Sequence, residues 1–188
     1  MSKLETNQVD PATGTTLTLG TSGDTITIPS GVTIANSGTA TGFGGTNTPA
    51  FEAYSAATQN INSATDTLVV FGTEALDTDS NFASNRFTPT TAGKYYVYSS
   101  LSLQSTGYTM YNTISKIYKN GSNYKSSPII SANDALYASP ITLSAIIDMN
   151  GSSDYVEMYA YMELHSGSVR RLQPETKGTY FGAYKIIE

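Results

Sequence analysis

The stretch from Gly93 to Gln104 constrains the fold most, because its side chains alternate in polarity. One parity is mostly apolar and consists of Tyr95, Val97, Leu101 and Leu103, interrupted by Ser99. The other parity is mostly polar and consists of Tyr96, Tyr98, Ser100, Ser102 and Gln104. A period of two predicts a β-strand with one buried face. Pro89 and Gly93 mark the turn that precedes it.

The rest of the chain after residue 48 also consists of predicted strands. They cover residues 49–57, 67–73, 111–119, 122–130, 135–149, 155–165 and 179–187. Residues 67–73 form a continuous apolar run, which predicts burial on both faces, and residues 74–80 are predicted as an acidic loop. Asn120-Gly121 predicts a tight hairpin, and Pro140 marks a bulge, an edge or a strand start. With no helical period, the fold class is an antiparallel β-sandwich or jelly roll.

Residues 1–48 differ from the head domain predicted at 49–188, because they are rich in Thr, Ser and Gly. Three aliphatic pairs are each separated by one Thr: Leu17/Leu19, Ile26/Ile28 and Val32/Ile34. This pattern predicts short strands ended by Gly or Pro turns. A strand with two inward side chains cannot offset its ordering entropy alone, whereas three chains wound around an axis could. The alternative is a disordered linker.

Composition excludes several kinds of site and partner. Only 13% of residues are charged, against about 25% in a typical domain. The net charge of −5 and the scattered basic residues argue against nucleic-acid binding. The absence of cysteine excludes disulfides and thiolate sites. We expect no membrane insertion, because no apolar run approaches about 18 residues, and no signal peptide, because the N-terminal MSKLETNQVD lacks an apolar h-region.

Few residues suggest chemistry. A single histidine, His165, and acids placed in loops predict no enzyme. Asp77, Asp79 and Asn81 form a D-x-D-x-N run whose oxygens suit calcium, although an EF-hand's glycine and distal glutamate are missing. No other cofactor is expected. Loops at 105–108, 131–137 and 166–177 are candidates for recognising sugars or proteins.

The strand at 155–165 places three tyrosines on its outward parity: Tyr155, Tyr159 and Tyr161. That is more aromatic area than a monomer usually leaves in water. It predicts a subunit interface of a homotrimer, or contacts to a neighbouring sheet.

The chain beyond residue 48 resembles the trimeric jelly rolls typified by tumour necrosis factor and the globular head of the first complement component. The resemblance is carried by an ordered set of motifs: Pro49-Ala50-Phe51-x-Ala53, Val70-Phe71, Phe82, Arg86-Phe87-Thr88-Pro89, Gly93-x-Tyr95-x-Val97, Lys119-Asn120-Gly121 and Tyr180-Phe181-Gly182-Ala183-Tyr184. It implies a homotrimeric jelly-roll head. Ser153-Asp154-Tyr155 departs from the Gly-Asp that the family often has before its next valine.

Residues 1–39 resemble the opening segments of tail-fibre and other structural proteins of marine bacteriophages. The two resemblances together imply a virion fibre, spike or decoration protein, made in the host cytoplasm and carried on the particle. Its attachment residues would be Leu4, Val9, Leu17 and Leu19. Its partners would be capsid, tail or portal-proximal proteins and a host-surface glycan or protein. The alternatives are a secreted or cell-surface carbohydrate-binding module and a glycan-cleaving fibre.

Overall fold

The computed structural model describes residues 9, 11–38, 47–132 and 136–186. The chain divides into two units, Met1–Phe43 and Gly44–Glu188. The boundary predicted between residues 48 and 49 falls a few residues beyond that division.

The first unit contains turns but no strand within residues 11–38. Asp24 organises one turn, because its Oδ2 accepts hydrogen bonds from the Thr21 N–H at 2.7 Å and the Thr21 Oγ1 at 3.0 Å. The short strands predicted around the three aliphatic pairs are therefore not formed in the single chain. The reason is burial, since these six side chains are 43–62% exposed and have no apolar surface to cover them.

The second unit is all-β. Its strands are β1 Ala50–Tyr54, β2 Gln59–Asn60, β3 Thr67–Leu68, β4 Thr73–Asp77, β5 Phe82–Ala83, β6 Arg86–Phe87, β7 Gly93–Gln104, β8 Met110–Lys119, β9 Ser122–Ile130, β10 Ala138–Met149, β11 Val156–Leu164, β12 Arg171–Gln173 and β13 Tyr180–Lys185.

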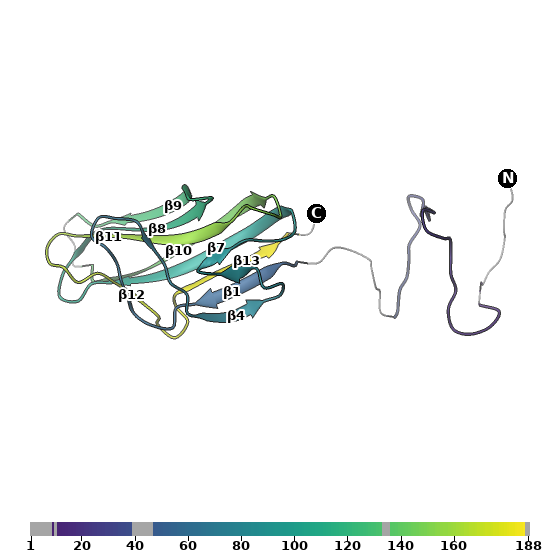
Figure 1. Ribbon diagram of the computed structural model, residues 1–188, viewed down its shortest axis with the longest axis horizontal. Helices are drawn as coiled ribbons and strands as arrows, with labels where there is room; N and C mark the ends of the chain where they lie inside the picture. Colours follow the sequence, from purple (N-terminus) through teal and green to yellow (C-terminus); the bar gives the residue numbers. More distant parts are fainter. Residues whose placement is uncertain (1–8, 10, 39–46, 133–135, 187–188) are drawn as a thin grey trace. The chain divides into compact units, whose positions relative to one another are not determined.

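The strands form two antiparallel sheets (Figure 1). Sheet A has the order β2-β12-β7-β13-β1-β4, and β10 pairs with the other edge of β7. Sheet B has the order β5-β6-β11-β8-β9, and β3 also pairs with β11. The predicted antiparallel jelly-roll sandwich is confirmed.

Strand β7 follows the predicted alternation, except at Ser100, an outward position that is also buried. The buried inward side chains are Tyr95, Val97, Ser99, Leu101 and Leu103. Ser99 fits this inward set because its hydroxyl donates to the Leu143 carbonyl at 3.3 Å. The Asn120-Gly121 hairpin is also confirmed, since both residues have positive φ, 52° and 77°.

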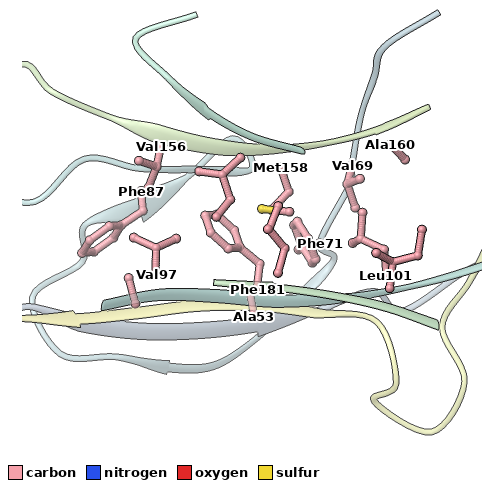
Figure 2. Packing of buried hydrophobic residues seen from close by; sticks show 14 of the residues in the cluster. Ala53, Val69, Phe71, Phe87, Val97, Leu101, Val156, Met158, Ala160 and Phe181 are labelled. Carbon is pink, nitrogen blue, oxygen red and sulfur yellow. The ribbon is translucent and has the colours of Figure 1, made fainter. Parts of the chain in front are cut away.

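The core lies between the two sheets and is centred on phenylalanines. Figure 2 shows side chains of sheet A, such as Phe181, pointing toward Met158 and other residues of sheet B. The Phe51 ring stacks on Phe82 at 4.7 Å and on Phe87 at 4.4 Å, and meets Phe181 edge-on at 4.9 Å. Such pairs add about 0.5–1.5 kcal/mol each beyond area burial.

Two predictions upstream of β7 are wrong. Residues 67–73 are not one doubly buried strand, because β3 ends at Leu68 and Val70 is exposed. Side-chain amides take over the backbone pairing there: Gln59 Oε1 accepts from Val70 N–H at 2.9 Å, and Asn85 Oδ1 accepts from Phe71 N–H at 2.8 Å. The predicted acidic loop at 74–80 begins instead as β4, the edge strand of sheet A beside β1.

The free edge of β10 is covered by side chains of the β8–β9 hairpin. Three alternate carbonyls, those of Ser144, Ile146 and Asp148, accept hydrogen bonds from Lys125, Tyr124 and Lys119 at 2.8, 3.2 and 2.7 Å. Pro140 on the same strand has no N–H to offer. Its prediction as an edge marker is therefore confirmed, because β10 pairs only with β7 among the described strands.

We predict that Phe51→Ala lowers the free energy of unfolding by about 3–5 kcal/mol, because it removes a fully buried ring from the centre of the core. Urea unfolding of the full chain, at matched protein concentration, measures the change. Val70→Ala is the control and should cost less than about 0.5 kcal/mol, since Val70 is exposed. Equal losses in the two variants would contradict the phenylalanine-centred core.

Candidate binding surface

The outer side of sheet A carries four tyrosines in one group. We call this surface the tyrosine face and define it by Tyr96 and Tyr98 of β7 and Tyr180 and Tyr184 of β13. Tyr184 lies opposite Tyr96 in the strand pairing, and their ring centroids are 5.6 Å apart. The Tyr98 ring lies 5.9 Å from Tyr96, 6.1 Å from Tyr180 and 6.4 Å from Tyr184.

Gly182 allows this close grouping. It lies between the two tyrosines of β13 and opposite Tyr98. A Cβ atom added to Gly182 would lie 2.4 Å from the Tyr98 Cζ, well inside van der Waals contact. The glycine is therefore required because the Tyr98 ring lies directly over its backbone.

Glu52 is a carboxylate within the same row of the sheet. It lies opposite Gly182 on β1, and its Oε2 accepts a hydrogen bond from the Tyr98 hydroxyl at 2.9 Å. Burial of the phenol raises the pKa of Tyr98 well above its ordinary value, and the hydrogen bond to Glu52 raises it further. Tyr98 thus remains a neutral hydrogen-bond donor at physiological pH.

A groove of about 460 Å³ opens over this face. It is lined by Tyr96, Tyr98, Ser99, Thr142, Leu143, Ser144, Tyr180 and Tyr184. Ile146 lies opposite Tyr96 at the β10 side and is 57% exposed, which extends the apolar surface to the sheet edge. Aromatic rings beside hydroxyl groups suit contact with a protein surface or a sugar ring.

The three tyrosines predicted as the trimer interface lie on the other sheet. Tyr159 and Tyr161 project from β11 on the outer face of sheet B, and Tyr155 directly precedes that strand. Each is half-buried and has a partner in its own chain: Arg86 lies 3.6 Å above the Tyr155 ring, Tyr118 lies 4.2 Å from Tyr159, and Lys116 lies 5.2 Å from Tyr161. The aromatic area that motivated the prediction is thus partly covered within one subunit, and their interface role stays a prediction.

Ion pairs hold this surface of sheet B in place. The buried Glu157 Oε1 accepts two hydrogen bonds from Arg86, at 3.0 and 2.8 Å, which raise the pKa of the guanidinium. Asp66 accepts from Lys116 at 2.6 Å and from the Tyr118 hydroxyl. The bond to Asp66, reinforced by burial, raises the pKa of Tyr118 to about 12.

The residues predicted for calcium lie at the end of β4 and in the turn that follows it, where their side-chain oxygens accept hydrogen bonds from nearby groups of the chain. The Asp77 carboxylate accepts from the N–H groups of Asn81 and Phe82 at 3.0 and 2.9 Å. Asn81 Oδ1 accepts from Thr90 N–H at 2.9 Å, and Thr78 donates to Asp79 at 2.5 Å. The turn accounts for the D-x-D-x-N run without an ion, and calcium binding there stays a prediction.

The candidate segment 166–177 is not one loop, because Arg171–Gln173 form β12 and Lys177 lies 5.0 Å from the Tyr54 ring. Backbone hydrogen bonds connect parts of the other two loops and their surroundings: Ser105 N–H donates to the Tyr137 carbonyl at 2.8 Å, and His165 N–H donates to the Thr109 carbonyl at 3.1 Å. His165 Nε2 lies 2.9 Å from the Ser131 carbonyl, and its ring lies 5.1 Å from that of Tyr111. Among the described residues, no three His, Asp or Glu side chains are grouped as metal ligands.

Of the predicted attachment residues, Leu4 lies outside the described residues. Val9, Leu17 and Leu19 are all exposed in the first unit. In the parts of the chain that the structure covers, no helix is long and apolar enough to cross a membrane.

The tyrosine face is a unit that the sequence did not reveal. Alternation places Tyr96 and Tyr98 on the outward parity of β7, but it does not connect them with Tyr180 and Tyr184. A signal was present in the last strand, where these two tyrosines share one parity with Gly182 and the other parity holds Phe181 and Ala183. What the pattern could not supply was the pairing of β13 with β7.

No protein-family model and no curated protein matches the chain. Among solved structures, the globular domain of the zebrafish complement 1qA protein is similar, with a TM-score of 0.54 and 16% sequence identity. The match covers 73% of this chain and 96% of that one. It shows the fold, and it confirms the resemblance to complement globular heads at that level.

We predict that Gly182→Ala lowers the free energy of unfolding by about 1–3 kcal/mol, because the new methyl group displaces the Tyr98 ring. Thermal or urea unfolding measures the loss. The double variant Gly182→Ala/Tyr98→Ala should be less destabilised than the sum of its single changes, since the clash disappears with the ring. Strict additivity would contradict this close approach.

We predict that Tyr118 titrates near pH 12, above the ordinary tyrosine value of 10.0. Because the folded state holds the phenol proton more tightly than the unfolded chain, this contribution to stability is complete below about pH 10. It is lost as the pH rises from 10 to 12. Tyrosinate absorbance follows the titration, and Tyr118→Phe should remove one late-titrating group. Asp66→Asn should move that group back toward 10, and no change on this substitution would refute the assigned cause.

Proposed function

We propose that the chain is a structural protein of a bacteriophage particle that assembles as a homotrimer. In this proposal it is a fibre, spike or decoration protein, with residues 1–48 toward the particle and the jelly-roll head outward. The observation that carries the trimer is the tyrosine face, where three half-buried tyrosines and the more exposed Tyr184 lie side by side and adjoin the exposed Ile146.

The tyrosine face is mainly aromatic, and the charges on and beside it are of both signs: Glu52 is a carboxylate on it, and Lys177 lies 5.0 Å from the Tyr54 ring at its margin. A second copy of the chain offers the same aromatic rings and the same two opposite charges. The chain also has no cysteine, so no disulfide braces the head. Burial between subunits would supply stabilisation of about 25 cal/mol for each Å² of apolar surface covered.

The particle-bound role rests on the first unit. Val9, Leu17 and Leu19 are exposed aliphatics, and with Leu4 they are the residues we propose for attachment to capsid, tail or portal-proximal proteins. A surface built of Thr, Ser, Asn and Gly, with only 13% charged residues, fits a protein that works outside the cell on a virion.

The loop end of the head is the proposed contact with a host-surface glycan or protein. Its exposed tyrosines, Tyr108, Tyr111 and Tyr137, come from segments that backbone hydrogen bonds connect to one another. We propose recognition by binding, without catalysis. A purely decorative head is the variant of this proposal in which these loops contact nothing.

A second candidate is a carbohydrate-binding module, which the groove on the tyrosine face favours. Its aromatic walls and the hydroxyls of Thr142 and Ser144 suit stacking and hydrogen bonding to a sugar. The homotrimer and the carbohydrate-binding module differ in what contacts the tyrosine face. The trimer covers the groove, whereas the module leaves it open for a glycan.

The mass in solution tests the trimer. By light scattering at micromolar concentration we expect the mass of three chains, each of 20.0 kDa. Tyr96→Ser/Tyr184→Ser should shift the protein toward the mass of one chain, because it removes two central rings of the proposed interface. The matched comparison is Tyr155→Ser/Tyr161→Ser on sheet B, which tests the interface predicted from the sequence. If the tyrosine face is the interface, this variant keeps the mass of the trimer.

Each contrary outcome has a distinct meaning. Loss of the trimer in the sheet B variant alone would return the interface to Tyr155, Tyr159 and Tyr161. A wild-type protein with the mass of one chain would refute the homotrimer. A monomer whose groove binds glycans, with binding lost in Tyr96→Ser/Tyr184→Ser, would support the carbohydrate-binding module.

A further inference from the structure

We propose that residues 17–34 of each copy pair with the same residues of two other copies, forming a β-structure between chains that is absent from the single chain. The inference rests on the proposed homotrimer and adds to it a second interface between its copies. It places Leu17 and Leu19 in that interface, which leaves Leu4 and Val9 for attachment to the particle. The segments involved are three triplets, Leu17-Thr18-Leu19, Ile26-Thr27-Ile28 and Val32-Thr33-Ile34.

Each triplet presents apolar side chains at every second residue. In an extended chain the two aliphatics of a triplet lie on one side and the threonine on the other. In the structure all six aliphatics are exposed, between 43% for Leu17 and 62% for Leu19. The aliphatic side chains alternate as they do on the buried face of a β-strand, but in the single chain no second sheet or neighbouring chain covers them.

The backbone of the triplets is also available for pairing. The hydrogen bonds within residues 11–38 lie at turns, such as Asp24 N–H to the Thr21 carbonyl at 3.0 Å. Across the described residues, Val32 N–H is the one backbone group of the triplets with a backbone partner, the Pro29 carbonyl at 3.2 Å. Unpaired strand edges readily add further strands.

The turns between the triplets are already formed. Gly20 and Gly31 have φ values of +82° and +86°, which other residues rarely adopt. The Asp24 carboxylate fixes the turn before the second triplet through its two hydrogen bonds to Thr21. Preformed turns reduce the entropy that pairing has to overcome.

The occupant that fits best is another copy of the same segment. Asp24 is the one charged residue between positions 11 and 38 of the sequence, so the segment offers a single charge to a charged partner. Its repeated triplets are complementary to one another because they present the same spacing and the same side-chain type. A partner with matching triplets is therefore supplied by the chain itself.

Association of three copies can also offset the entropy cost of ordering these triplets, which a single chain cannot do. Ordering a residue costs about 1–2 kcal/mol. A Leu, Ile or Val side chain returns about 1.5–3 kcal/mol only when it is fully buried. The head would hold the copies together, since only a short stretch of sequence separates Ile34 from Pro49. Short connections of this kind give effective concentrations on the order of millimolar.

Hydrogen exchange on the full-length protein tests the inference, with its mass measured in the same sample. We expect amides of residues 17–34 in the wild type to exchange about tenfold or more slowly than in Leu19→Ser/Ile26→Ser/Ile28→Ser. The matched control, Thr18→Ser/Thr27→Ser/Thr33→Ser, changes the opposite parity and should keep the protection. Equal loss of protection in both variants would overturn the proposal.

A cross-linking experiment shows directly whether the contact is between chains. The natural chain has no cysteine, so a disulfide in a single-cysteine variant joins two copies. Ile28→Cys should cross-link on oxidation about tenfold faster than Thr27→Cys, because only the first faces its copies. Equal rates would indicate a flexible tether and would overturn the pairing.

The outcomes separate this inference from the proposed trimer. A protein with the trimer mass but with unprotected residues 17–34 would overturn the inference and leave the homotrimer standing. A protein with the mass of one chain would remove the homotrimer and the inference together. Protection that appears only when a virion protein is added would overturn the inference in favour of a different partner.

Discussion

The backbone pairing of β7 along both of its edges is the constraint on which the head depends. On one edge β7 pairs with β10 over its whole length, and on the other it pairs with β12 and β13. A strand held on both sides cannot rotate, so its two parities are committed to two different environments. The inward parity ends in the core with Tyr95 and Leu101, and the outward parity ends on the tyrosine face with Tyr96 and Tyr98.

The two faces of sheet A are therefore consequences of one register. On β13 the same alternation sends Phe181 into the core and places Tyr180, Gly182 and Tyr184 on the outside. Because Gly182 lies opposite Tyr98, the ring can lie flat against the sheet and reach Glu52 on the next strand. A shift of one residue would bury the tyrosines and expose the phenylalanine, which makes the surface and the core energetically inseparable.

The sequence was sufficient wherever a local rule decides the structure. Alternation located β7 and β11, and the demand for positive φ located the Asn120-Gly121 hairpin. Prediction from the sequence failed where a residue far away in the chain determines whether a side chain is exposed or covered. The exposure of Val70 depends on Gln59, and the covering of Tyr155 depends on Arg86, neither of which has a local signal. For the same reason the outward tyrosines of β7 and β11 looked alike in sequence, although those of β7 lie against other tyrosines and those of sheet B lie against Arg86, Tyr118 and Lys116.

The hydrogen bonds from Lys119, Tyr124 and Lys125 to the β10 edge have a consequence wherever many copies of the head are crowded together. Copies of a β-rich protein held side by side risk fusing laterally into fibrils. Here the edge carbonyls of Ser144, Ile146 and Asp148 are already occupied by the same subunit. Neighbouring heads can then pack densely without forming backbone hydrogen bonds between their β10 edges. Side-chain complementarity, and not strand pairing, then determines which surfaces come into contact.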